Sequence, residues 1–274
     1  MLPVAVWQPD FTVTPVETED TVPAHIDRIV GTGFDVATEV PVRIRLLTVT
    51  DTDHVLVLVV HHIAADGFSM GPLGRDLMTA YAARAEGHAP TWSPLPVQYA
   101  DYTLWQHTVL GDESEPASLA ARQLAFWHDA LAGAPELLEL PWDRPRPVQQ
   151  SGRGARVAFE IGTDTHRGML ALARAHDASL FMVVHAALTV LLARLSTSDD
   201  IVIGTPVAGR GDRALDDLVG MFVNTVVLRA PVDERERFDS LLRRVRSADL
   251  AAFGQADVPF ERLVEALDPP RSTS

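Results

Sequence analysis

The chain has 274 residues, which at roughly 150 residues per domain allows one large domain or two modest ones, and its 47% apolar and 22% charged content excludes disordered and fibrous classes. The absence of cysteine excludes disulfide scaffolds, thiolate zinc sites, iron–sulfur clusters and cysteine nucleophiles, and suits a reducing compartment. The 37 acidic residues outnumber 23 basic ones, all arginine, and the net charge of −14 argues against nucleic acid and anionic membranes as partners.

No segment of the sequence has the pattern of an export signal or a membrane span. Residues 1–7 are apolar, but the first basic residue is Arg28, so a basic region before an apolar core is missing. The most apolar stretch, residues 180–195, contains polar interruptions and is shorter than the roughly 20 residues of a spanning helix. We expect a cytoplasmic protein in which residues 180–195 form a buried helix.

Two strand-like runs between residues 41 and 63 surround a short acidic turn at residues 51–53, a pattern that predicts a β-hairpin. Six consecutive apolar residues, 55–60, show no alternation. Such a run predicts a strand that is covered on both faces in the middle of a sheet.

Helical periodicity and further strands follow the hairpin. The predicted helices span residues 73–86, 118–131, 166–176, 180–195, 235–253 and 261–267, and the predicted strands span 201–203 and 221–228. Because helices and strands intermix, the predicted fold class is mixed α/β. A proline-rich, helix-incompatible linker near residue 145 predicts an N-terminal lobe of residues 1–145 and a C-terminal lobe of residues 146–274.

The densest group of chemically active residues follows the second strand of the hairpin. His61, His62, Asp66 and Gly67 lie within seven residues. Adjacent strand residues face opposite ways, so one histidine can point inward while its neighbour reaches a cavity. A neutral imidazole can accept a proton from an attacking amine or hydroxyl, and a glycine amide can donate to a developing oxyanion.

Two simpler interpretations compete with catalysis. A metal site could use His61, His62 and Asp66 with His54 nearby, but vicinal strand histidines diverge and no second ligand cluster follows. Alternatively, the histidines only end a strand and Asp66-Gly67 forms a turn. Asn224 is the single asparagine of a chain whose composition indicates a GC-rich genome, which makes it a candidate for a required side chain.

Residues 61–67, HHIAADG, resemble the HHxxxDG signature of the condensation domains of nonribosomal peptide synthetases, a branch of the chloramphenicol-acetyltransferase-like acyltransferases. Three further segments resemble motifs of this family and follow in the family's order: YADYTLW at 99–105, GMFVNT at 220–225 with Arg229, and QADVPFE at 255–261. Phe68 stands where tryptophan is common, and Ala256 interrupts a Gln-Asp pair. These changes are expected to alter packing more than chemistry.

The resemblance implies a two-lobed chloramphenicol-acetyltransferase-like fold with the active site between the lobes. It implies an acyltransferase that forms a peptide bond between two thioesters, each carried on the phosphopantetheine arm of a peptidyl carrier protein, in an assembly line that also contains an adenylation domain. No metal or tightly bound cofactor is implied.

The resemblance also assigns roles to individual residues. His62 is the expected base, or the group that positions the attacking amine, with His61 in support. Asp66 is counted with His62 and Gly67 among the residues of the catalytic motif, but its expected role is chiefly structural, in a pair with an arginine for which Arg210 is the candidate. Gly67 is expected to border the donor thioester, and the Asn224 amide to bind substrate or pantetheine. Tyr99, Asp101 and Trp105, a set of buried aromatics with a carboxylate, are expected to be structural, as are Asp257, as a capping acid, Pro259 and Phe260.

The family's first two motifs have no counterpart before Met1, and residues 269–274 resemble only the beginning of its last motif. We therefore expect a fragment that lacks both ends of the domain and is poorly stable or inactive alone. Two alternative functions are an ester- or amide-forming HxxxD acyltransferase that uses coenzyme A, and a noncatalytic carrier-binding or recruitment domain of the same fold. An epimerase relative is disfavoured by the residues that follow Asp66-Gly67.

Overall fold

A computed structural model describes residues 10–145, 147 and 154–268. The chain divides into two compact units: unit 1 contains Met1–Leu104 and Arg210–Val223, and unit 2 contains Trp105–Gly209 and Asn224–Ser274. Each unit combines helices with a small sheet, which confirms the mixed α/β class. The predicted boundary between the two lobes lies next to residue 146, which is outside the described residues. This boundary therefore stays a prediction.

Unit 1 is built on a three-stranded sheet in the order β1-β2-β3. Strands β2 (Val42–Thr48) and β3 (His54–Val60) form the predicted antiparallel hairpin. Strand β1 (Asp10–Pro15) pairs with β2 in parallel, which requires a crossover connection. A short 3₁₀ turn (Glu19–Thr21) and helix α1 (Val22–Gly31) provide that crossover.

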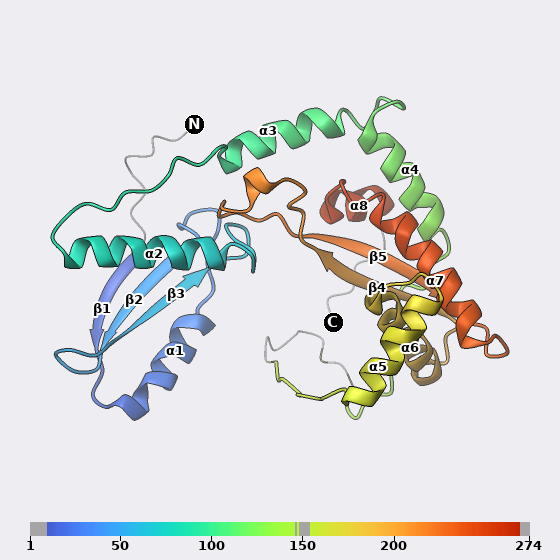
Figure 1. Ribbon diagram of the computed structural model, residues 1–274, viewed down its shortest axis with the longest axis horizontal. Coiled ribbons are helices and arrows are strands. Elements are labelled where there is room, and N and C mark those ends of the chain that lie inside the picture. The colour runs from blue at the N-terminus through green and yellow to red at the C-terminus, as the bar shows by residue number, and fades with distance from the viewer. Residues whose placement is uncertain (1–9, 146, 148–153, 269–274) are drawn as a thin grey trace. The chain divides into compact units, whose positions relative to one another are not determined.

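Helix α1 covers one face of this sheet, beside β3 (Figure 1). Val22 packs there with Leu47 and Val57 in a buried cluster. On the opposite face, Phe11 and Leu56 are 55% and 43% exposed. The prediction that β3 is a central strand covered on both faces is therefore wrong for the described part of the chain. The central strand of this sheet is β2. Residues 55–60 of β3 are all apolar although only one face of the strand is packed.

Two helices complete the larger part of unit 1. Helix α2 (Met70–Ala85) follows the His61-His62 turn and confirms the helix predicted at residues 73–86. Helix α3 (Tyr99–Leu110) begins in unit 1 and was not among the predicted elements. A second segment of unit 1, Arg210–Val223, contains a 3₁₀ turn at Arg213–Leu215.

Unit 2 contains the remaining predicted elements. Strands β4 (Asp200–Val207) and β5 (Asn224–Pro231) pair antiparallel along their whole length. Helix α7 (Phe238–Phe253) packs on β5 and on α6 (Leu180–Ser196), which in turn contacts α5 (Thr163–Ala175) (Figure 1). Helices α4 (Leu119–Leu131) and α8 (Phe260–Leu267) pack together over a second cluster that contains Trp127 and Val226.

Helix α6 confirms the helix predicted at residues 180–195, but only one of its faces is buried. Met182, Ala186 and Thr189 lie in the core, whereas Phe181 and Leu191 are 42% and 53% exposed. Within the described ranges no single helix is both long enough and apolar enough to span a membrane, and only the sharply bent pair α5 and α6 meets the length and composition criteria together.

Candidate active site

His61 directly follows the last residue of β3 and is anchored in unit 1. Its main-chain amide donates to the carbonyl of Pro41 at 2.9 Å, and its ring meets that of Phe34 edge-on at 6.0 Å between centroids. Its Nδ1 accepts a hydrogen bond from the amide of Ile63 at 3.1 Å. This contact ties the His61 ring to the main chain of the loop. His61 therefore holds the first turn of the loop.

His62 and Gly67 are the exposed members of the motif. No hydrogen bond joins the His62 side chain to any other residue in the part of the chain that the structure describes. An imidazole in this state is free to bind an incoming donor and to accept its proton. Both histidines lie beyond β3, which ends at Val60, so the alternation expected for strand neighbours does not apply to them. His61 is partly buried and His62 is exposed.

Asp66 lies at the other end of the loop with no side-chain exposure. Its carboxylate accepts hydrogen bonds from the Ser69 hydroxyl at 2.7 Å, the Ser69 amide at 2.9 Å, and the Phe222 amide and Arg210 Nη2 at 3.1 Å each. Burial alone would raise the pKa of Asp66, but these hydrogen bonds outweigh burial and hold the pKa below its usual value. Asp66 therefore stays ionised and is placed to hold the loop, with no oxygen left exposed to a substrate.

Arg210 is the partner of Asp66, which confirms the pairing predicted from the sequence. The guanidinium also donates to the carbonyls of Leu215 and Leu218 and lies 4.0 Å from the centroid of the Phe222 ring. Its side chain is 5% exposed. A buried charge requires such compensation, and Arg210 thereby joins Asp66 to the segment at residues 215–222.

Gly220 allows that segment to lie against Tyr99. A Cβ atom at Gly220 would be 2.2 Å from Cδ2 of Tyr99, so no other residue fits without movement of the ring. The Tyr99 hydroxyl donates to the carbonyl of Met221 at 2.7 Å. Burial, together with the nearby charge of Asp66, raises the pKa of Tyr99.

The structural interpretation of the 99–105 motif holds for two of its three residues. Tyr99 packs as described, and the Asp101 carboxylate accepts from the amide of Gln98 at the start of α3. Trp105, expected to be buried, is 58% exposed.

Asn224 differs from its predicted role. Its Nδ2 donates to the carbonyls of Ala256 and Val258 at 2.9 and 2.8 Å, and its Oδ1 accepts from the amides of Thr225 and Phe260 at 2.8 and 2.9 Å. Main-chain groups thus occupy all four hydrogen-bonding positions of the amide. The expectation that this amide binds substrate or pantetheine is replaced by a structural role within unit 2.

Two further buried side chains were not predicted from the sequence. Ser69 is fully buried and contacts Asp66, Arg210 and Gly220. In unit 2, the Gln123 Oε1 accepts from the amides of Asp257 and Val258, and its Nε2 donates to the Asp257 carboxylate. Asp257 therefore binds Gln123 and does not cap α8; the amide of Phe260, the first residue of α8, donates to Asn224 Oδ1 instead. Apart from Asp66, the partners of Ser69 and Gln123 are more than 130 residues away, so local spacing carries no signal for these contacts.

The metal alternative receives no support from the geometry. Within the described ranges no three histidine, aspartate or glutamate side chains gather as a metal site would require. Asp66 is directed to Arg210, and Nδ1 of His61 is occupied by a main-chain amide.

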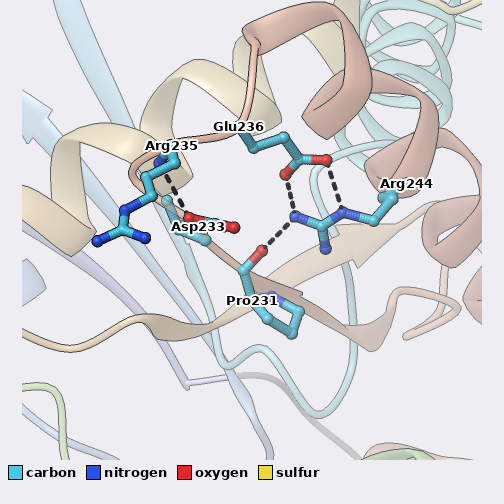
Figure 2. Close-up of a pocket in the computed structure, with 6 residues that line it drawn as sticks. Pro231, Asp233, Arg235, Glu236 and Arg244 are labelled. Carbon is cyan, nitrogen blue, oxygen red and sulfur yellow. Dashed lines mark hydrogen bonds and ion pairs between the residues drawn. The ribbon is translucent and has the colours of Figure 1, made fainter.

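A hollow of about 450 Å³ in unit 2 lies where β5 leads into α7 (Figure 2). Its polar groups bind one another: Glu236 forms an ion pair with Arg244, and the Arg235 amide donates to Asp233. The guanidinium of Arg244 lowers the pKa of Glu236. Neither a histidine nor a nucleophile lines this hollow, so the exposed turn at His62 remains the candidate active site.

Comparison with known proteins places this geometry in a family. The family model described as "Condensation domain" matches residues 4–274. The chain is 55% identical over 241 residues to a probable non-canonical nonribosomal peptide synthetase, CymA, of Salinispora arenicola, and 48% identical over 264 residues to a dimodular nonribosomal peptide synthase of Bacillus subtilis. The two matches cover 88% and 96% of this chain, but only 3% and 11% of those much longer proteins.

Solved structures agree with the sequence match. An X-domain from teicoplanin biosynthesis, in a complex with OxyB, has a TM-score of 0.90 and 35% identity; the match covers 96% of this chain and 58% of that one. A four-domain nonribosomal peptide synthetase bound to AMP and glycine has a TM-score of 0.82 and 26% identity, over 98% of this chain and 20% of that one. The chain belongs to the condensation domain family of the nonribosomal peptide synthetases.

Proposed function

We propose that the protein containing this chain forms peptide bonds by acyl transfer between carrier-bound aminoacyl or peptidyl thioesters. The observation that carries the proposal is the exposed imidazole of His62, which has no hydrogen-bond partner among the described residues. It stands on a turn whose other end is fixed by the buried Asp66–Arg210 pair. Membership in the condensation domain family supports the same activity.

In the proposed reaction, the α-amine of the acceptor attacks the carbonyl carbon of the donor thioester. His62 orients the amine and accepts the proton that it loses. The new C–N bond forms as the C–S bond breaks, and the proton passes to the sulfur of the released phosphopantetheine thiol. The exposed main chain at Gly67 is the candidate donor to the oxyanion. Asp66 and Arg210 act as positioning residues.

The proposed partners are an upstream and a downstream peptidyl carrier protein, with an adenylation domain in the same assembly line. The substrates are held on phosphopantetheine arms, and the chemistry requires no metal. Relatives described as dimodular or four-domain synthetases support a multidomain setting. A cytoplasmic location remains a prediction.

His62→Ala tests this role in the full-length protein. We expect His62→Ala to reduce dipeptide formation from two loaded carrier proteins by at least a hundredfold, because the proton acceptor is lost. His54→Ala is the matched control, since His54 is also an exposed histidine in unit 1, at the far end of β3. Product is measured by mass spectrometry. Equal turnover by His62→Ala and His54→Ala would remove His62 from the reaction.

The donor in the same assay separates condensation from the coenzyme A alternative. The acyl group is supplied either on a carrier protein or on coenzyme A. Transfer only from the carrier protein supports condensation. Transfer only from coenzyme A identifies the ester- or amide-forming HxxxD acyltransferase that uses coenzyme A.

Recruitment of a partner protein is the second candidate function. It is favoured by one observation, the TM-score of 0.90 to an X-domain solved in a complex with OxyB. Binding of a partner enzyme with no transfer from either donor would support recruitment over catalysis.

A further inference from the structure

The Ser69 hydroxyl is a fully buried polar group at the base of the His62 turn. Five polar atoms lie within hydrogen-bond distance of its oxygen. These are Asp66 Oδ1 at 2.7 Å, the Gly220 carbonyl at 2.8 Å, Arg210 Nη2 at 3.0 Å, the Gly220 amide at 3.1 Å and the Asp66 amide at 3.3 Å. A hydroxyl has one donor and two acceptor positions. Ser69 is therefore saturated, and every partner is itself part of the candidate site or of the segment that supports it.

The position of Ser69 in the chain makes these contacts unusual. Ser69 immediately precedes α2, where a serine ordinarily accepts a hydrogen bond from an amide of the first helical turn. The Ser69 side chain makes no such capping bond. By contrast, Ser118 caps α4 by accepting from the amide of Ala121 at 3.0 Å. The hydroxyl of Ser69 thus serves a contact across unit 1 in place of its own helix.

The contacts of Ser69 bridge two parts of unit 1 that are far apart in sequence. Gly220 is 151 residues away. The Gly220 segment cannot shift freely, because Tyr99 fills the space beside Gly220. The Asp66 amide donates directly to the Gly220 carbonyl at 3.2 Å, and Ser69 adds contacts to both the carbonyl and the amide of Gly220, so the two residues together hold the turn against this segment.

The remainder of the turn is held by local contacts: the amide of Ala64 donates to the His61 carbonyl at 2.9 Å, and Ala65 is buried. His62, Gly67 and Phe68 are exposed, between the anchor at His61 and the anchor formed by Asp66 and Ser69. Loss of the Ser69 hydroxyl would leave Asp66 held by Arg210 and by the Phe222 amide, but it would remove the one side chain among the described residues that joins the Asp66 carboxylate to both main-chain polar groups of Gly220. A displacement of about 1 Å at a reacting group can lower a rate by on the order of a hundredfold.

We propose that Ser69 is a positioning residue for the acyl transfer: its hydroxyl fixes the Asp66-Gly67 turn against Gly220 and so sets where His62 and Gly67 meet the substrates. The inference rests on the proposed function. Ser69 itself is buried and touches no substrate.

The test compares Ser69→Ala, Ser69→Cys and Ser118→Ala in the full-length protein. The thiol of Cys is a weak donor and acceptor of similar size, so hydrogen bonding by the side chain decreases from Ser to Cys to Ala at position 69. Ser118→Ala is the control, because it removes an ordinary helix cap. Turnover is measured at saturating loaded carriers, with KM for each carrier. Hydrogen exchange by mass spectrometry follows the peptide that contains residues 61–69.

We expect Ser69→Ala to lower kcat on the order of ten- to a hundredfold with KM within about twofold, and Ser69→Cys to fall between Ala and Ser. We expect residues 61–69 to exchange faster than in Ser118→Ala, while exchange in the β1-β2-β3 sheet is unchanged. Ser118→Ala should retain the kcat of the unmodified protein.

Three results would overturn the proposal: a kcat for Ser69→Ala equal to that of Ser118→Ala, exchange at residues 61–69 equal in the two variants, or faster exchange throughout unit 1, which would assign Ser69 to general stability. If the unmodified protein forms no peptide bond, the proposed function fails, and the exchange comparison alone decides whether Ser69 fixes the turn.

Discussion

The amide of Asn224 binds four main-chain groups and joins the start of β5 to residues 256–260. Hydrogen bonds that satisfy buried main-chain groups stabilise modestly when present, but their loss leaves desolvated groups without partners. The Asn224 side chain is the hydrogen-bond partner of four main-chain groups, so one substitution at this position removes the partner of all four.

We expect Asn224→Ala to lower the free energy of unfolding by about 1–3 kcal/mol, because the amide of Phe260 and the carbonyls of Ala256 and Val258 lose their partner. Urea denaturation followed by far-UV circular dichroism measures the loss. Thr165→Ala, at an exposed position on α5, is the control and should change stability by less than about 0.5 kcal/mol. Equal midpoints for the two variants would contradict the structural role of Asn224.

Among the elements, α6 and α7 are joined by a buried polar pair. His185 Nδ1 lies 3.1 Å from Oδ2 of Asp249, and the side chains are 3% and 0% exposed. The Nε2 of His185 has no partner in the described part of the chain. A buried pair of this kind contributes little over an apolar pair, but removal of one member leaves the other uncompensated.

We expect Asp249→Leu to destabilise the protein by about 3–5 kcal/mol. We expect His185→Leu with Asp249→Leu to recover most of that loss, since both polar groups are then removed together. A double-mutant cycle in urea measures the coupling free energy between the two positions. Additive losses would show that the pair is not coupled.

The elements of unit 2 could be predicted from the sequence because their apolar residues recur at helical or strand spacing. Two helices and one strand of unit 1 were not. Helix α1 carries Val22, Ile26 and Ile29 at helical spacing, a signal that is present in the sequence, whereas α3 exposes Leu104 and Val109 and has no single apolar face. Strand β1 is only six residues long.

Some features of the candidate site could likewise be predicted from the sequence, and others could not. The HHxxxDG spacing and the Asp66–Arg210 pair could be predicted, the pair through the family resemblance. The saturated amide of Asn224 and the hydroxyl of Ser69 could not, because hydrogen-bond partners in distant segments follow from tertiary packing. The edge position of β3 also depends on strand order, which an apolar run does not encode.

At the scale of the whole molecule, lowered carboxylate pKa values occur in both units. In unit 1, burial raises the pKa of Asp66, but hydrogen bonds from Ser69, Phe222 and Arg210 lower it further than burial raises it. In unit 2, Arg262 lowers the pKa of Glu113 and Arg244 lowers that of Glu236. A carboxyl group whose pKa is lower in the folded state stabilises the fold above its unfolded pKa, and this stabilisation is lost as pH falls through the folded pKa.

We therefore expect the thermal midpoint to be nearly constant from about pH 6 to 8 and to fall steadily below about pH 5, as the unfolded chain binds protons first. Calorimetry across this range measures the midpoint. Glu236→Gln should lower the midpoint at pH 7 and make its decline in acid shallower. A midpoint that rises on acidification would contradict the direction of these pKa shifts.

Unit 1 is formed by two segments that are separate in the chain. Asp66 pairs with Arg210, which is 144 residues later in the sequence and is therefore synthesised later. At a synthesis rate of about 5–20 residues per second, the ribosome takes roughly 7 to 29 s to make the intervening chain. During that interval the Asp66 carboxylate and the Ser69 hydroxyl have none of their distant partners, and the β1-β2-β3 sheet must persist without the segment that locks the turn. The loop of the candidate active site is therefore completed late, only after most of unit 2 has already been synthesised.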